Sequence, residues 1–155
     1  MEVLINNRQN KHKIPQKRIK QTARAILDAL DCPDGELSIL LVDDQQIEKI
    51  NTEYLNREGP TNVIAFPMRE GEFGELTPDL LGDVVISVET AGREADTAGI
   101  SMQKRFDQLL IHGILHLMGY DHEKTQKEAT RMEEKSSQLL KMLDVAVDDV
   151  NQVQR

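Results

Sequence analysis

The string HGILHLMGYDH, residues 112–122, constrains the fold of this chain more than any other segment. His112 and His116 are four residues apart in a region predicted to be helical over 102–118, so both imidazoles project from one side of the helix. Gly119 suits the left-handed conformation in which helices often end, which would turn the chain and bring His122 toward the other two histidines. The predicted inward stripe of the same helix consists of Phe106, Leu109, Leu110, Gly113 and Leu117. The histidines are therefore expected at the edge of the core.

Three histidine ligands with a fourth position left open are typical of a catalytic zinc site. The spacing matches the metzincin peptidase helix H-E-x-x-H-x-x-G-x-x-H, except that Gly113 stands where the peptidases carry their general-base glutamate. We therefore expect one Zn²⁺ per chain, held by His112, His116 and His122, and chemistry other than proteolysis. The alternatives are three unrelated histidines on a helix and its following loop, or nickel or copper at the same site.

Length and composition indicate one small domain. The chain has 155 residues, 39% of them hydrophobic, but only 3% aromatic and no Trp, so the core must be aliphatic. Cys32 is the single cysteine, which favours a reducing, cytoplasmic location. No apolar run approaches the ~18 residues of a membrane helix, so no membrane partner is expected.

The distribution of charge departs from the net charge of −8. Residues 3–27 contain seven basic residues and no acidic one, which predicts a surface that attracts anions on an acidic body. A helix is predicted from Pro15, and Lys17, Lys20 and Arg24 share one stripe of it. We expect these three residues to contact RNA, the alternative being an ordinary solvated helix face.

The coarse pattern predicts an α+β domain with a small four-stranded mixed sheet and about five helices. Asp43 and Gln46 are placed as a capping box at the start of the second helix. We expect a single domain over 1–143 and a polar, frayed tail over 144–155. The predicted strands are 2–6, 37–42, 63–66 and 84–88, and the predicted helices are 15–30, 43–54, 89–98, 102–118 and 123–143, with an exposed loop at 69–80.

The segment HGILHLMGYDHE resembles the signature of the YbeY family of bacterial rRNA maturation endoribonucleases. Residues 60–67 (PTNVIAFP), 81–87 (LGDVVIS) and the alanines 91 and 95 agree with it, so the resemblance covers roughly residues 35–143. It implies a small mixed sheet with packed helices, and one zinc bound by the three histidines. It also implies 3′-end maturation of 16S rRNA and ribosome quality control, with single-stranded RNA and the small ribosomal subunit as partners and no DNA.

The family carries an arginine after a tyrosine, several residues ahead of the Pro-Thr pair. Here the stretch is LNREGPT, and Arg57 is the one basic residue in a position to fill that role. The resemblance implies that Arg57 acts in catalysis beside His112 and His116, where its guanidinium would bind a phosphate. The alternative is a solvated turn arginine. Asp121 would either accept an N–H from a liganding imidazole or cap the next helix at Glu123.

These features favour a zinc-dependent endoribonuclease specific for single strands, whose nucleophile is either a zinc-activated water or the RNA 2′-hydroxyl. The runner-up is a non-catalytic, zinc-stabilised ribosome assembly factor, because the peptidase general base is missing at Gly113. A metallopeptidase is disfavoured for the same reason.

Overall fold

The computed structural model describes residues 2–68, 79–121 and 123–153, with side chains up to Asp144. The elements are β1 (Glu2–Asn7), α1 (Gln16–Ala29), β2 (Glu36–Val42), α2 (Asp44–Leu55), β3 (Val63–Pro67), β4 (Leu80–Ser87), α3 (Val88–Ala98), α4 (Met102–Leu117) and α5 (Gln126–Val153). The predicted α+β class is confirmed, with a four-stranded sheet and five helices in the described part of the chain.

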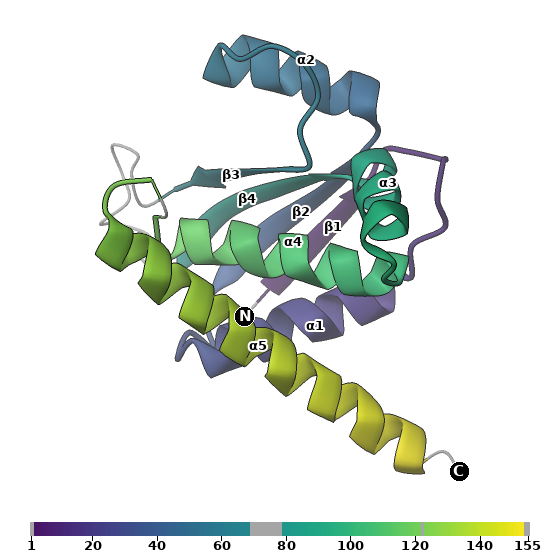
Figure 1. The fold of residues 1–155 in the computed structure, drawn as a ribbon, viewed down its shortest axis with the longest axis vertical. Coiled ribbons are helices and arrows are strands. Elements are labelled where there is room, and N and C mark those ends of the chain that lie inside the picture. The colour runs from purple at the N-terminus through teal and green to yellow at the C-terminus, as the bar shows by residue number, and fades with distance from the viewer. Residues whose placement is uncertain (1, 69–78, 122, 154–155) are drawn as a thin grey trace.

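The sheet has the strand order β1-β2-β4-β3 (Figure 1). β1 pairs with β2, and β2 with β4, in parallel, whereas β3 pairs with β4 in the antiparallel direction. β1 and β3 are therefore the two edge strands.

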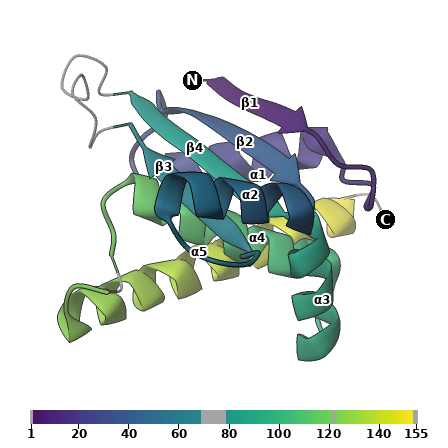
Figure 2. The same ribbon diagram turned by 90° about the horizontal axis from the view of Figure 1, so that it is seen from above.

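Helices cover both faces of the sheet. α1, α4 and α5 lie on one face and α2 lies on the other (Figure 2). β2 supplies residues to both cores: Leu37, Ile39 and Leu41 join the larger cluster, and Val42 joins the smaller cluster under α2. This confirms the prediction that residues 37–42 form a strand covered on both faces.

The capping box that opens α2 is also confirmed. The Asp43 carboxylate accepts from the Gln46 backbone N–H at 2.9 Å, and the Gln46 side chain accepts from the Asp43 N–H at 3.0 Å. Two of the otherwise unpaired donors at the helix start are thereby satisfied.

Several boundaries differ from the predicted ones. Pro15 is the N-cap of α1 rather than its first residue. β4 begins at Leu80 instead of residue 84, because it pairs with β2 from Leu80 onward and with β3 from Gly82 onward. Residues 69–78 of the predicted loop lie outside the described residues.

The last helix differs at both ends. α5 begins at Gln126 rather than residue 123, because the Thr125 hydroxyl caps it by accepting from the Glu128 N–H at 3.0 Å. It continues to Val153, ten residues past the predicted end at 143. Residues 144–153 contain neither glycine nor proline, so no residue there ends the helix.

Candidate active site

His112 and His116 lie side by side on α4, as the four-residue spacing predicts. Their Nε2 atoms are 3.0 Å apart, and the ring planes are inclined by 76° with centroids 4.5 Å apart. Both side chains are half-buried, whereas the neighbouring apolar residues of α4 are fully buried. The pair therefore lies at the boundary between the core and solvent, with the two Nε2 atoms at hydrogen-bonding distance from one another.

The end of α4 has the predicted left-handed geometry. Gly119 has φ +96°, its N–H donates to the His116 carbonyl at 3.1 Å, and the Tyr120 N–H donates to the Leu115 carbonyl at 3.0 Å. These two bonds define a Schellman motif, which reverses the chain directly after the second histidine. His122 lies outside the described residues, so its approach to the pair remains a prediction.

Gly113 lies where α4 packs tightly against β4. A Cβ atom at this position would stand 2.6 Å from Cγ1 of Val84 on β4. The glutamate that serves peptidases as a general base therefore has no room here. The departure from the peptidase motif is a consequence of how α4 packs on β4.

The two histidines share an open cleft of about 420 Å³ with Arg57, although 55 residues separate Arg57 from His112 in sequence. The cleft lies at the β3 edge, between the end of α2 and the end of α4. Its lining consists of Leu55, Arg57, Ile64, Ala65, Pro67, His112, His116, Gly119, Tyr120, Asp121, Glu123 and Lys124. The fold thus brings the arginine implied by the family resemblance to the histidine pair.

Backbone and side-chain hydrogen bonds fix the loop that carries Arg57. Asn56 adopts the left-handed conformation at the end of α2, and the Arg57 N–H donates to the Asn51 carbonyl at 3.2 Å. The Thr52 hydroxyl shares its proton between the Glu48 carbonyl at 3.0 Å and the Arg57 carbonyl at 3.2 Å, and the buried Asn51 amide donates to the Gly59 carbonyl at 3.0 Å. The backbone of Arg57 is therefore held against the last turns of α2.

Lys124 is a second cation of the cleft that sequence reasoning missed. The signal was available, because Lys124 is the first basic residue after the histidine motif. Its place in the cleft depends on the turn at Gly119, after which Tyr120, Asp121, Glu123 and Lys124 line the cleft.

Asp121 does not cap the next helix, so that alternative is wrong. Its carboxylate accepts from the Glu123 N–H at 2.8 Å within a local turn, and Thr125 caps α5 instead. The other expectation, an imidazole N–H bound by Asp121, remains a prediction.

Lys17, Lys20 and Arg24 lie on α1, away from this cleft. α1 packs on β1, α4 and α5, whereas the cleft lies at the opposite edge strand, β3 (Figure 1). None of the three lines the cleft. The basic stripe is therefore a separate surface from the histidine pair, and its contact with RNA remains a prediction.

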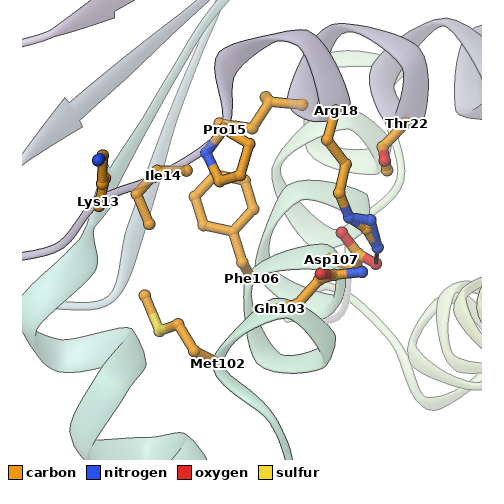
Figure 3. Close-up of a pocket in the computed structure, with 10 residues that line it drawn as sticks. Lys13, Ile14, Pro15, Arg18, Thr22, Met102, Gln103, Phe106 and Asp107 are labelled. Carbon is orange, nitrogen blue, oxygen red and sulfur yellow. Dashed lines mark hydrogen bonds and ion pairs between the residues drawn. The ribbon is translucent and has the colours of Figure 1, made fainter.

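A smaller cavity of about 190 Å³ lies between the first turns of α1 and α4. Figure 3 shows Arg18 and Asp107 directed toward one another in this cavity, beside the ring of Phe106. The guanidinium and the carboxylate are 3.3 Å apart. Burial, only partly opposed by the Arg18 charge, raises the pKa of Asp107 to about 6.

The histidine pair fits a zinc ion. Bonds of ~2.0–2.1 Å in a tetrahedron place neighbouring ligand atoms about 3.3–3.4 Å apart, and the two Nε2 atoms are 3.0 Å apart. Neutral imidazole nitrogens are also the usual donors for this metal. Among the described residues no three His, Cys, Asp or Glu side chains form a metal-sized group, and the third predicted ligand, His122, is not among those residues.

Fold and site together define a class: small α+β enzymes with a histidine pair in a cleft at the edge of a mixed sheet, lined by two cations and two carboxylates. The profile of the family described as "Endoribonuclease YbeY" matches residues 4–144. The chain belongs to the endoribonuclease YbeY family.

Individual relatives agree along almost the whole chain. The "Endoribonuclease YbeY" proteins of Geobacter sulfurreducens and Geobacter metallireducens are 49% and 50% identical to it over 145 residues, covering 93% of this chain and 97% of each relative. A solution structure of TM1509 from Thermotoga maritima superposes with a TM-score of 0.64 at 25% identity, covering 89% of this chain and 86% of that one. In the described residues, no helix is both long and apolar enough to cross a membrane.

Proposed function

We propose that this endoribonuclease cleaves single-stranded RNA with the help of one zinc ion, and that it acts in the cytoplasm on the small ribosomal subunit. The proposed role is 3′-end maturation of 16S rRNA and ribosome quality control. One observation carries the proposal: Arg57 and Lys124 share a single cleft with the His112–His116 pair. Cations beside a metal-binding pair suit a phosphodiester, because charge builds on the phosphate oxygens during cleavage.

The residues of the cleft have separate proposed roles. His112 and His116, together with His122, would hold the zinc, which when bound supplies Lewis acidity toward the scissile phosphate. The Arg57 guanidinium is suited to bind two phosphate oxygens at once. Because the hydrogen bonds from Asn51 and Thr52 fix the Arg57 loop, the backbone that carries the exposed side chain is already in place before the phosphate binds. Lys124 adds a second positive charge to the lining of the same cleft.

The nucleophile is either water or the 2′-hydroxyl of the RNA, and the two leave different ends. Attack by the 2′-hydroxyl leaves a 2′,3′-cyclic phosphate, whereas attack by water leaves a linear phosphate. Analysis of the product ends by mass spectrometry decides between them.

A second candidate is a ribosome assembly factor in which zinc only stabilises the fold. The observation that favours it is Gly113, where contact with Val84 leaves no space for the general base of the peptidases. Such a factor would bind the small subunit without turning over RNA.

The deciding experiment is turnover on a fragment carrying the unprocessed 3′ end of 16S rRNA. Wild-type protein, His116→Ala and Arg57→Ala are purified in parallel, so that a contaminating nuclease would appear in all three. We expect cleavage of the single strand by the wild type and loss of cleavage in both variants. Equal cleavage by all three preparations, or none by zinc-loaded wild type, would favour the assembly factor. Mapping 16S rRNA 3′ ends in cells depleted of the protein tests the same role in vivo.

A further inference from the structure

Large hydrophobic side chains left in water are concentrated beside the histidine cleft. Of the four in the described residues, Tyr54, Leu55 and Met68 are lining residues of this cleft or their neighbours in sequence, with exposed fractions of 70%, 37% and 39%. Leu55 lines the cleft, Tyr54 precedes it on α2, and Met68 follows the lining residue Pro67. The fourth, Leu4, lies on β1 at the far edge of the sheet. Clustered apolar exposure of this kind marks binding surfaces.

Most of the described aromatic residues also lie outside the buried core. The chain has five, and of the four in the described residues only Phe106 is buried in the core. Tyr120 lines the cleft, and Tyr54 packs edge-to-face on Phe66, with ring centroids 6.0 Å apart and an angle of 76° between the planes. Phe66 is half-buried against the cluster beneath α2, so it supports the exposed Tyr54 ring.

We propose that Tyr54, supported by Phe66, stacks with an unpaired base of the RNA next to the phosphate bound by Arg57. This inference rests on the proposed function and names the part of the substrate that the cleft itself does not bind. A nucleotide joins an anionic phosphate to a flat ring with apolar faces. Arg57 and Lys124 suit the phosphate, and the exposed tyrosine suits the base, because every base can stack on an aromatic ring.

Strand β3 contributes residues both to the histidine cleft and to the support of Tyr54. Ala65 and Pro67 line the histidine cleft, whereas Phe66 between them packs toward α2. Among the described strands β3 pairs only with β4, so a nucleotide chain that passes from the histidine pair to Tyr54 crosses the outer edge of this strand. A base held in a duplex has no face open for such stacking, and the contact therefore selects for single strands.

Three variants test the contact through their affinity for a short oligoadenylate. Tyr54→Ala should weaken binding by about tenfold, since stacking on one aromatic ring contributes ~1–3 kcal/mol. Tyr54→Phe keeps the ring and should bind as the wild type does. Leu4→Ala removes the exposed side chain at the opposite edge and should change nothing. The slope of log affinity against log salt should be the same in all of them, because stacking releases no counterions.

A second measurement reports stacking directly. The chain has no tryptophan, so Tyr54→Trp introduces a single tryptophan at the proposed contact, which can be excited selectively over the remaining tyrosine, Tyr120. Oligoadenylate should quench its emission, whereas an abasic ribose-phosphate oligomer of the same length should not. A loss of affinity caused by local disturbance of α2 would not produce this difference.

The inference is overturned if Tyr54→Ala binds and cleaves RNA as the wild type does, or if the abasic oligomer quenches equally. In that case the exposed surface would suit a protein partner instead. Failure of the proposed function has a different signature, since wild-type protein would then cleave no RNA and Arg57→Ala would have no effect. The two failures are therefore distinguishable in one set of experiments.

Discussion

Gly113 of α4 lies so close to Val84 of β4 that a Cβ atom on residue 113 would stand 2.6 Å from Cγ1 of the valine. Contacts that short force a neighbour to move, and both residues lie in the buried core. This contact allows the helix that carries His112 and His116 to approach β3 and β4. It also explains why a helix that resembles a peptidase zinc helix lacks the peptidase carboxylate.

Gly113→Ala should destabilise the protein by about 1–3 kcal/mol, because overpacking outweighs the ~1 kcal/mol that alanine gains in helix propensity. Urea unfolding measures the difference. In a Val84→Ala background, which removes the clashing methyl groups, Gly113→Ala should be neutral or stabilising. An equal loss in both backgrounds would show that contact with Val84 is not the cause.

His116→Ala should remove a zinc ligand and with it most of the retained metal. We expect about one equivalent of zinc per chain in the wild type by plasma mass spectrometry, and little after dialysis of the variant. His12→Ala is the matched control, because His12 packs near Gly92 on α3 and is outside the cleft. Retention of metal at wild-type affinity would exclude His116 from the ligands.

Asp107 should make stability fall as pH rises from about 4 to 6. Its pKa is raised from 3.8 to about 6 in the folded state, chiefly by burial, so the native protein binds this proton more tightly than the unfolded chain does. Protonated Asp107 therefore favours folding below this window, and the advantage is lost as the carboxyl ionises through the folded pKa. The shift corresponds to roughly 3 kcal/mol.

The difference in unfolding free energy between wild type and Asp107→Asn isolates this contribution from other titrating groups. Asp144→Asn should lower the pKa of Asp107, because the charge of Asp144 contributes to raising it. If the difference in unfolding free energy between wild type and Asp107→Asn does not change from pH 4 to 6, the raised pKa of Asp107 is contradicted.

The Lys17→Ala, Lys20→Ala and Arg24→Ala triple variant tests the basic stripe of α1. If the stripe binds the RNA backbone, affinity should fall at low salt, and the log–log salt slope should flatten by ~0.7 per lost phosphate contact. Replacing three other exposed lysines, Lys104 of α4 with Lys127 and Lys141 of α5, controls for net charge. Arg57→Ala should instead reduce cleavage more than binding, because its partner charge grows in the transition state. An unchanged salt slope in the triple variant would leave the stripe as a solvated helix face.

Local signals determined most of the secondary structure. The capping box at Asp43 and Gln46 and the left-handed Gly119 depend on residues within one or two turns, and both were predictable. The His112–His116 pair was predictable for the same reason, since the helical repeat alone places them together. The start of α5 was missed because Asp121 and Thr125 offer similar caps, and the competition is settled only in the folded turn.

Sequence by itself therefore determined the elements and the histidine pair, because these depend on neighbours along the chain. Tertiary structure decided which other residues share the cleft with the two histidines. Arg57 reaches the cleft because β3 and β4 pair in the antiparallel direction and α4 packs on both, bringing the end of α2 near the end of α4. The same packing left the basic stripe of α1 at the other edge of the sheet. Such contacts depend on strand order and packing between distant segments, which no local pattern encodes.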